Sequence, residues 1–134
     1  MKKINFTSPL LSISLHSGIN VYERKSAIGK SFIPMLAKQY SDAPMFISFS
    51  TKEEYKQFIA NGIDNDLNNT IYFLDRFDLF KNDQIIDILK TVNNAIVLID
   101  LKDRCYLDSH CIDSDTIAID YENGGYHIKY ASFD

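Results

Sequence analysis

Several features that define whole classes of proteins are scarce in this chain of 134 residues. Two cysteines are too few for a disulfide framework, which excludes the small disulfide-stapled folds. Five glycines and three prolines exclude a collagen-like fibre and predict mostly regular structure with short turns. No apolar run approaches the roughly 18 residues that a membrane span requires, and no continuous apolar segment follows the two N-terminal lysines as in a signal peptide. We therefore expect a cytoplasmic protein with no membrane partner and with reduced thiols.

An excess of basic charge is also missing, because 14 Lys and Arg residues face 18 Asp and Glu residues, for a net charge of −4. This balance argues against nucleic acid as a direct ligand. The net negative charge falls in residues 100–134, which have eight acidic and three basic side chains and form either a solvated edge or a surface for a basic partner. The 46% of hydrophobic residues is enough for one modest core, so we expect a single domain over residues 1–134.

Strand and helix patterns alternate along the chain. Residues 11–22 predict a β-hairpin, with apolar alternation on both sides of a turn at Ser17-Gly18. Apolar residues between Phe32 and Tyr40 recur at helical spacing, with Pro34 near the start of that helix. Residues 101–114 are polar and predict no element, whereas residues 116–130 predict a second hairpin.

The middle of the chain gives the clearest signals. A capping box over Ser50–Glu54 begins one helix, and Asn82-Asp83 begins the next. Short apolar runs predict strands at residues 45–49, 71–74 and 95–99. The alternation predicts an α/β fold, a three-layer sandwich with a mainly parallel sheet and with β-hairpins at its N- and C-terminal ends. In such sheets ligands bind at the carboxyl ends of the strands, that is, just after Tyr22, Phe49, Leu74 and Ile99.

A phosphate-loop motif follows the first of these strand ends. The pattern is G-x-x-x-x-G-K-[ST], and the chain matches it at Gly29, Lys30 and Ser31, with Arg24 at the first glycine position. In such a loop backbone N–H groups bind phosphate oxygens, the lysine neutralises the β- and γ-phosphates, and the hydroxyl ligates Mg²⁺. The expected nucleotide-binding residues are Arg24, Lys25, Ser26, Ala27, Ile28, Gly29, Lys30 and Ser31. The competing interpretation is a capped helix with an exposed lysine.

A strand-terminal aspartate completes the pattern. Asp75 follows the apolar run that ends at Leu74 and is expected to hold Mg²⁺ through water, so the predicted metal residues are Ser31 and Asp75. Together the two segments resemble the phosphate-loop NTPases, in the class with an extra strand between the phosphate-loop strand and the Asp-bearing strand. The resemblance covers roughly residues 11–102, and its start is similar to ABC-type ATPase domains, although no LSGGQ-like signature follows. It implies Mg-ATP or Mg-GTP as ligand and Asp100 or Lys102 at the position that senses the γ-phosphate.

Three departures describe a minimal or degenerate member. Arg24 replaces a glycine whose torsions a Cβ penalises. Arg76 stands directly after Asp75, where the resemblance implies a catalytic glutamate, and a guanidinium is not a base at neutral pH. Asp78 is a substitute displaced by two residues, and the chain is short for the class. We therefore expect binding more than hydrolysis, and whether the chain is an enzyme stays open.

The sequence is consistent with two functions. The first is a small protein that binds ATP or GTP with weak or absent hydrolysis and signals through a protein partner. The second is a degenerate phosphate-loop fold that acts as a non-catalytic protein-binding module, by analogy with phage or mobile-element inhibitors of a host system. No zinc site is expected, because Cys105, His110 and Cys111 lack zinc spacing and a fourth ligand. Loop aspartates between residues 103 and 115 do not fit a calcium loop.

Overall fold

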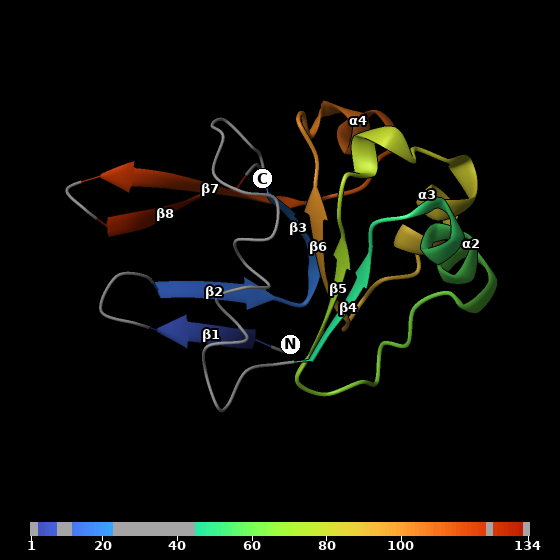
Figure 1. Cartoon of the computed structure of the whole chain (residues 1–134), viewed down its shortest axis with the longest axis horizontal. Coiled ribbons are helices and arrows are strands. Elements are labelled where there is room, and N and C mark those ends of the chain that lie inside the picture. Colours follow the sequence, from blue (N-terminus) through green and yellow to red (C-terminus); the bar gives the residue numbers. More distant parts are fainter. Residues whose placement is uncertain (1–2, 8–11, 23–44, 123–124, 133–134) are drawn as a thin grey trace.

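The computed structural model of the chain is an α/β fold built on two sheets. It describes residues 3–7, 12–22, 45–122 and 125–132, with side chains for residues 15–21 and 45–115. A small sheet pairs strands β1 (Lys3–Thr7) and β2 (Ser12–His16) antiparallel. The main sheet has six strands in the order β4-β5-β6-β3-β7-β8, as Figure 1 shows. Its strands are β3 (Gly18–Tyr22), β4 (Met45–Phe49), β5 (Thr70–Leu74), β6 (Ile96–Asp100), β7 (Asp115–Glu122) and β8 (Gly125–Ser132).

Parallel pairing dominates the main sheet, as the sequence predicted. Strands β4, β5, β6, β3 and β7 run parallel to their neighbours, and only β8 is antiparallel, in a hairpin with β7. The C-terminal hairpin is thus confirmed. The sequence did not predict that β7 also joins the parallel sheet, where residues 115–117 pair with residues 20–22 of β3. β6 lies between β3 and β5, so these two strands do not touch.

The predicted N-terminal hairpin over residues 11–22 is wrong in its pairing. β2 pairs with β1, whereas β3 enters the main sheet between β6 and β7. Only Ser17 separates β2 from β3, which is too short a connection for a hairpin. Gly18 bends the chain with φ of 106°, a torsion that glycine adopts readily. The buried side chain of Asn20 then donates hydrogen bonds to the backbone oxygens of His16 and Val97, at 3.0 and 3.1 Å.

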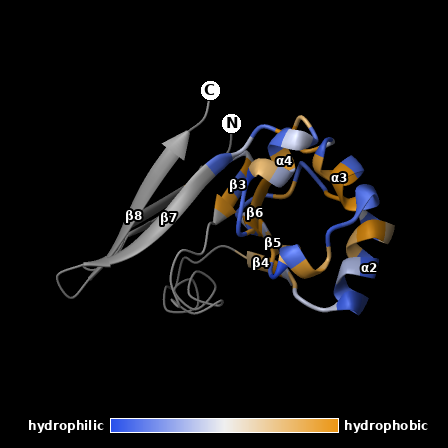
Figure 2. Ribbon diagram, turned by 90° about the horizontal axis from the view of Figure 1, so that it is seen from above, coloured by the Kyte–Doolittle hydropathy of each residue, from blue (hydrophilic) through white to orange (hydrophobic). Residues whose placement is uncertain are grey.

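Helices α2 (Lys52–Asn61), α3 (Asp83–Leu89) and α4 (Cys105–Ser109) lie on one face of the main sheet, with the 3₁₀ helix η1 (Phe77–Leu79) beside them (Figure 2). The predicted capping box is confirmed: the Thr51 hydroxyl accepts from the Glu54 N–H at 3.2 Å, and the Glu54 carboxylate accepts from the Thr51 N–H at 3.2 Å. α4 arises in the stretch for which no element was predicted. The predicted helix over residues 32–40 lies outside the described residues.

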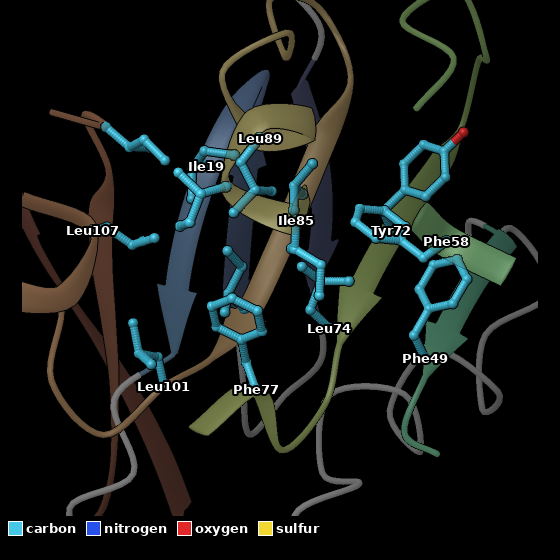
Figure 3. Packing of buried hydrophobic residues seen from close by; sticks show 14 of the residues in the cluster. Ile19, Phe49, Phe58, Tyr72, Leu74, Phe77, Ile85, Leu89, Leu101 and Leu107 are labelled. Atoms are coloured by element: carbon cyan, nitrogen blue, oxygen red, sulfur yellow. The ribbon is translucent and has the colours of Figure 1, made fainter. Parts of the chain in front are cut away.

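The core lies between this face and the helices. Alternate strand residues belong to this core, among them Val97 and Ile99 of β6. Tyr72 and Leu74 of β5 point toward the buried side of the helices (Figure 3). The opposite face of the central strands is buried as well, at Ile71, Phe73, Ile96 and Leu98. Burial on both faces explains why these strands read as continuous apolar runs.

Asn65 clamps the start of β6. Its Oδ1 accepts hydrogen bonds from the N–H groups of Asn93, Asn94 and Ala95, at 3.0, 3.1 and 3.0 Å, and its Nδ2 donates to the Thr91 carbonyl at 3.2 Å. We expect Asn65→Ala to lower the free energy of unfolding by about 2 kcal/mol, because several backbone donors lose their acceptor together. Urea denaturation followed by circular dichroism measures this loss.

The matched control for this clamp is Asn68→Ala in the same loop, where the side chain is exposed. We expect its effect to stay within about 0.5 kcal/mol. Equal losses in the two variants would contradict the role assigned to Asn65.

Candidate functional site

Two carboxyl groups meet where strands β5 and β6 end. Leu74 pairs with Ile99, so the next residues along the two strands, Asp75 and Asp100, are also neighbours. Leu74 and Ile99 point into the core under the helices, and side-chain alternation directs Asp75 and Asp100 to the other face of the sheet. The structure therefore brings the predicted metal residue Asp75 together with Asp100, one of the two residues expected at the sensor position.

This carboxyl pair is poorly solvated. Asp100 is buried and Asp75 is half-buried, and a hydrogen bond between the two carboxyl groups forms only when one of them carries a proton. Burial raises the pKa of Asp75, and the hydrogen bond and the negative charge of Asp100 raise it further, against a smaller opposing effect of Arg76. Oδ1 of Asp75 is buried and has no hydrogen-bond partner in the described part of the chain. The pair thus offers carboxylate oxygens, which are ligands that Mg²⁺ prefers, and the neighbouring groups offset only part of its negative charge.

Arg76 holds a strained backbone beside the pair. Its φ of 54° and ψ of 37° are left-handed, which non-glycine residues rarely adopt. Its N–H donates to Oδ2 of Asp100 at 3.2 Å, and its carbonyl accepts from the Leu79 N–H at 2.9 Å. Such strain is typical of functional sites. The Arg76 side chain is exposed, so the position directly after Asp75 presents a cation and no base.

Asp78 is engaged elsewhere. Its Oδ2 accepts from the Lys102 N–H at 2.9 Å, and its Oδ1 lies 3.6 Å from Nζ of Lys81. The first of these contacts joins the loop after β5 to Lys102, which lies two residues beyond the end of β6. The side chain of Lys102, the other expected sensor residue, is exposed. Asp78 therefore positions backbone and is a poor substitute for the glutamate that the sequence resemblance implies.

Tyr55 is a site residue that the sequence analysis assigned only to the core. Its ring is buried and stacks on Phe80, with centroids 4.6 Å apart, and its hydroxyl donates to the Asp75 carbonyl at 2.6 Å. Burial raises the pKa of the Tyr55 hydroxyl well above its ordinary value, with a further contribution from the charge of Asp75. Tyr55 stays protonated and fixes the backbone of Asp75 from the helical side. Its inward position on α2 was the only sequence signal, and that signal indicates a core residue equally well.

The predicted phosphate loop, Arg24 to Ser31, lies outside the described residues, and so does Ser31 as a predicted metal ligand. Its starting point is described, because Tyr22, the last residue of β3, pairs with Asp100. The segment that carries Gly29, Lys30 and Ser31 thus leaves the sheet one strand away from Asp100 and two strands away from Asp75.

The soft ligands considered in the sequence are dispersed over α4 and its flanks. Cys105 and Cys111 are exposed free thiols, and His110 packs against Tyr106 with ring centroids 4.9 Å apart. Among the residues with described side chains, no three His, Cys, Asp or Glu residues form a group suited to a metal ion. No helix within the described ranges is long and apolar enough to cross a membrane.

Comparison of the chain with protein-family models, with curated proteins and with solved structures gave no match in any of the three.

Proposed function

We propose that this chain is a small phosphate-loop protein that binds ATP or GTP with Mg²⁺ and hydrolyses it weakly or not at all. The observation that carries the proposal is the strand arrangement around Asp75 and Asp100. β3 leads into the Gly29-Lys30-Ser31 segment, β5 ends at Asp75, and β6 lies between them. An extra strand in this position is what the resemblance to phosphate-loop NTPases implies.

The carboxyl pair supports a divalent cation beside the phosphates. Mg²⁺ prefers oxygen ligands and keeps several waters, so a carboxylate such as Asp75 would hold it through water. A cation there would also offset the repulsion that raises the pKa of Asp75. Lys30 and Ser31 would bind phosphate and metal from the neighbouring loop.

Weak hydrolysis follows from the residues near the end of β5. Activation of the attacking water needs an acceptor, whereas Arg76 is a cation and Asp78 accepts the Lys102 N–H. The substitutions at Arg24 and Arg76 also fit the second candidate, a degenerate fold that binds a protein partner without nucleotide. Nucleotide binding therefore decides between the two functions.

The deciding experiment titrates Mg-ATP and Mg-GTP into the wild-type chain and into Lys30→Ala, by thermal shift and calorimetry. At about 100 times its Kd, a ligand stabilises the fold by about 2.7 kcal/mol, and we expect this shift in the wild type alone. Lys90→Ala, at the exposed C-cap of α3, is the control and should keep the full shift. Absence of any shift at millimolar nucleotide would refute nucleotide binding and favour the protein-binding module.

A further inference from the structure

A groove lies between α2 and the segment that joins η1 to α3, with a volume of about 340 Å³. From α2 it is lined by Lys52, Tyr55, Lys56 and Ile59, which share one helix face at spacings of three and four. Leu79, Phe80, Lys81, Asn82 and Ile85 form the other wall. The groove is separate from the carboxyl pair, because it opens on the helical side of the sheet.

The groove combines an apolar floor with a basic rim. Ile59, Phe80 and Ile85 supply apolar surface, and the lining residues include three lysines and no carboxylate. The lining of the groove is thus basic, although the chain as a whole has a net charge of −4. Glu53 lies 3.8 Å from Lys56, but both side chains are solvent-exposed, so this pair is weak. Lys81 is more firmly engaged, because its Nζ lies 3.6 Å from the half-buried Asp78 and 4.7 Å from the centre of the Tyr106 ring.

Leu79 marks the mouth of the groove as a contact surface. Its side chain is 72% exposed, the largest value among the exposed large apolar residues with described side chains. A lone exposed leucine is ordinary, but this one borders an apolar groove that lysine side chains also line. A partner that covers Leu79 and fills the groove would bury apolar surface at the centre and meet cations at the rim, as protein interfaces do.

The volume of the groove and the stacking of its aromatic rings indicate which kind of ligand it can bind. About 340 Å³ is at the low end for pockets that enclose whole small molecules, so it suits an anchoring side chain better than a complete cofactor. Single-stranded nucleic acid binds by stacking bases on open aromatic faces. Tyr55 is only 3% exposed and is already stacked by Phe80, so it offers no such platform.

We propose that this groove binds an acidic peptide segment of a partner protein, with one large apolar side chain in the groove and flanking carboxylates on Lys52 and Lys56. The inference does not depend on nucleotide binding, since it uses neither the phosphate loop nor the carboxyl pair. The partner proposed here is acidic, whereas a partner that binds the acidic residues 100–134 would be basic.

A random dodecapeptide library displayed on phage tests the proposal without a known partner. The library is selected on the wild-type chain after depletion on the triple variant Lys52→Gln/Lys56→Gln/Leu79→Ser. All three residues are exposed, so the variant should fold, and its circular dichroism and melting temperature check this. We expect the recovered peptides to be rich in Asp and Glu around one Phe, Leu, Ile or Met.

Fluorescence anisotropy then measures the Kd of the most enriched peptide. We expect Lys52→Gln/Lys56→Gln to raise this Kd about tenfold and Leu79→Ser to raise it several-fold, with weaker binding at higher salt. Lys90→Gln, an exposed lysine of α3 that does not line the groove, is the matched control and should leave the Kd unchanged.

Five results would overturn the proposal. Four of them are a library that yields no groove-dependent peptide, a recovered set that is basic or lacks the apolar residue, equal effects of the Lys90 and Lys52/Lys56 variants, and oligothymidylate binding that the groove substitutions abolish. The last of these four would assign the groove to nucleic acid. A dimer in sedimentation equilibrium that the triple substitution dissociates would likewise overturn it, by assigning the groove to a second copy of the chain.

Discussion

Asp75→Asn is expected to stabilise the fold at neutral pH and at the same time to weaken Mg-nucleotide binding. The asparagine cannot carry the negative charge that Asp100 repels, and its amide can donate to the Asp100 carboxylate. We expect a gain of about 1 kcal/mol in the free energy of unfolding, because the site is only partly shielded from solvent. We expect the Kd for Mg-ATP or Mg-GTP to rise at least about tenfold, because the residue proposed to hold the metal is lost.

The gain in stability should depend on pH with a defined sign. The pKa of Asp75 is raised in the folded chain, so its protonated form is the one that folding favours. The contribution of Asp75 to stability is therefore fully present below its unfolded pKa and is lost as the pH rises through the folded value. The difference in melting temperature between Asp75→Asn and the wild type should be small near pH 4 and grow to a plateau at neutral pH.

Thermal unfolding across this pH range measures the effect, and Asp87→Asn is the matched control. Asp87 is exposed on α3, away from the strand ends, so its replacement should leave the melting temperature nearly unchanged. A lower melting temperature for Asp75→Asn at neutral pH would contradict the repulsion described here. An unchanged affinity for Mg-nucleotide would contradict only the metal role, which rests on the proposed function.

Local signals in the sequence predicted the central elements correctly. α2 begins at the capping box and ends at Gly62, whose φ of 69° suits glycine. β4, β5 and β6 coincide with the apolar runs within one residue at each end. These signals succeed because a cap or a buried strand is defined by residues that are adjacent in the sequence.

The errors concern pairing between distant segments. The alternation in residues 11–15 predicts a strand but not its partner, and β2 pairs with β1 instead of β3. β7 meets β3 across more than ninety residues of chain, as in the pair Asn20 and Asp115, and no local pattern encodes that contact. α4 was missed because its stretch is polar, although Leu107 and Ile112 are buried there.

The same distinction divides the candidate site. Asp75 could be predicted because it directly follows an apolar strand, and the parallel sheet places Asp100 next to it. The left-handed backbone of Arg76 and the hydrogen bond from Tyr55 could not be predicted, because both depend on contacts between segments about twenty residues apart. The sequence thus predicts which strand ends form the site, whereas the hydrogen bonds within the site depend on tertiary packing.

Substitution of Phe77 has the largest expected effect on stability, because this residue joins the loop after β5 to the helices. Its ring is fully buried, with centroids 6.4 Å from Tyr55 and 5.9 Å from Tyr106 (Figure 3). We expect Phe77→Ala to lower the free energy of unfolding by about 3–5 kcal/mol, through lost burial and a cavity that the neighbours fill only partly. Denaturation in urea measures this loss, which is a large part of the 5–15 kcal/mol typical of a domain.

The matched control is Leu79→Ala in the same 3₁₀ helix, where 72% exposure predicts a change within about 0.5 kcal/mol. Native-state hydrogen exchange adds a test of the link to the site. The N–H groups of Leu79 and Phe80 bond within the η1 turn, and that of Lys102 bonds to Asp78. If Phe77 anchors this loop, these amides should lose protection in Phe77→Ala by more than the amides of α2 do. A uniform loss of protection would instead mean that Phe77 stabilises the whole core and has no special hold on the loop that follows Asp75.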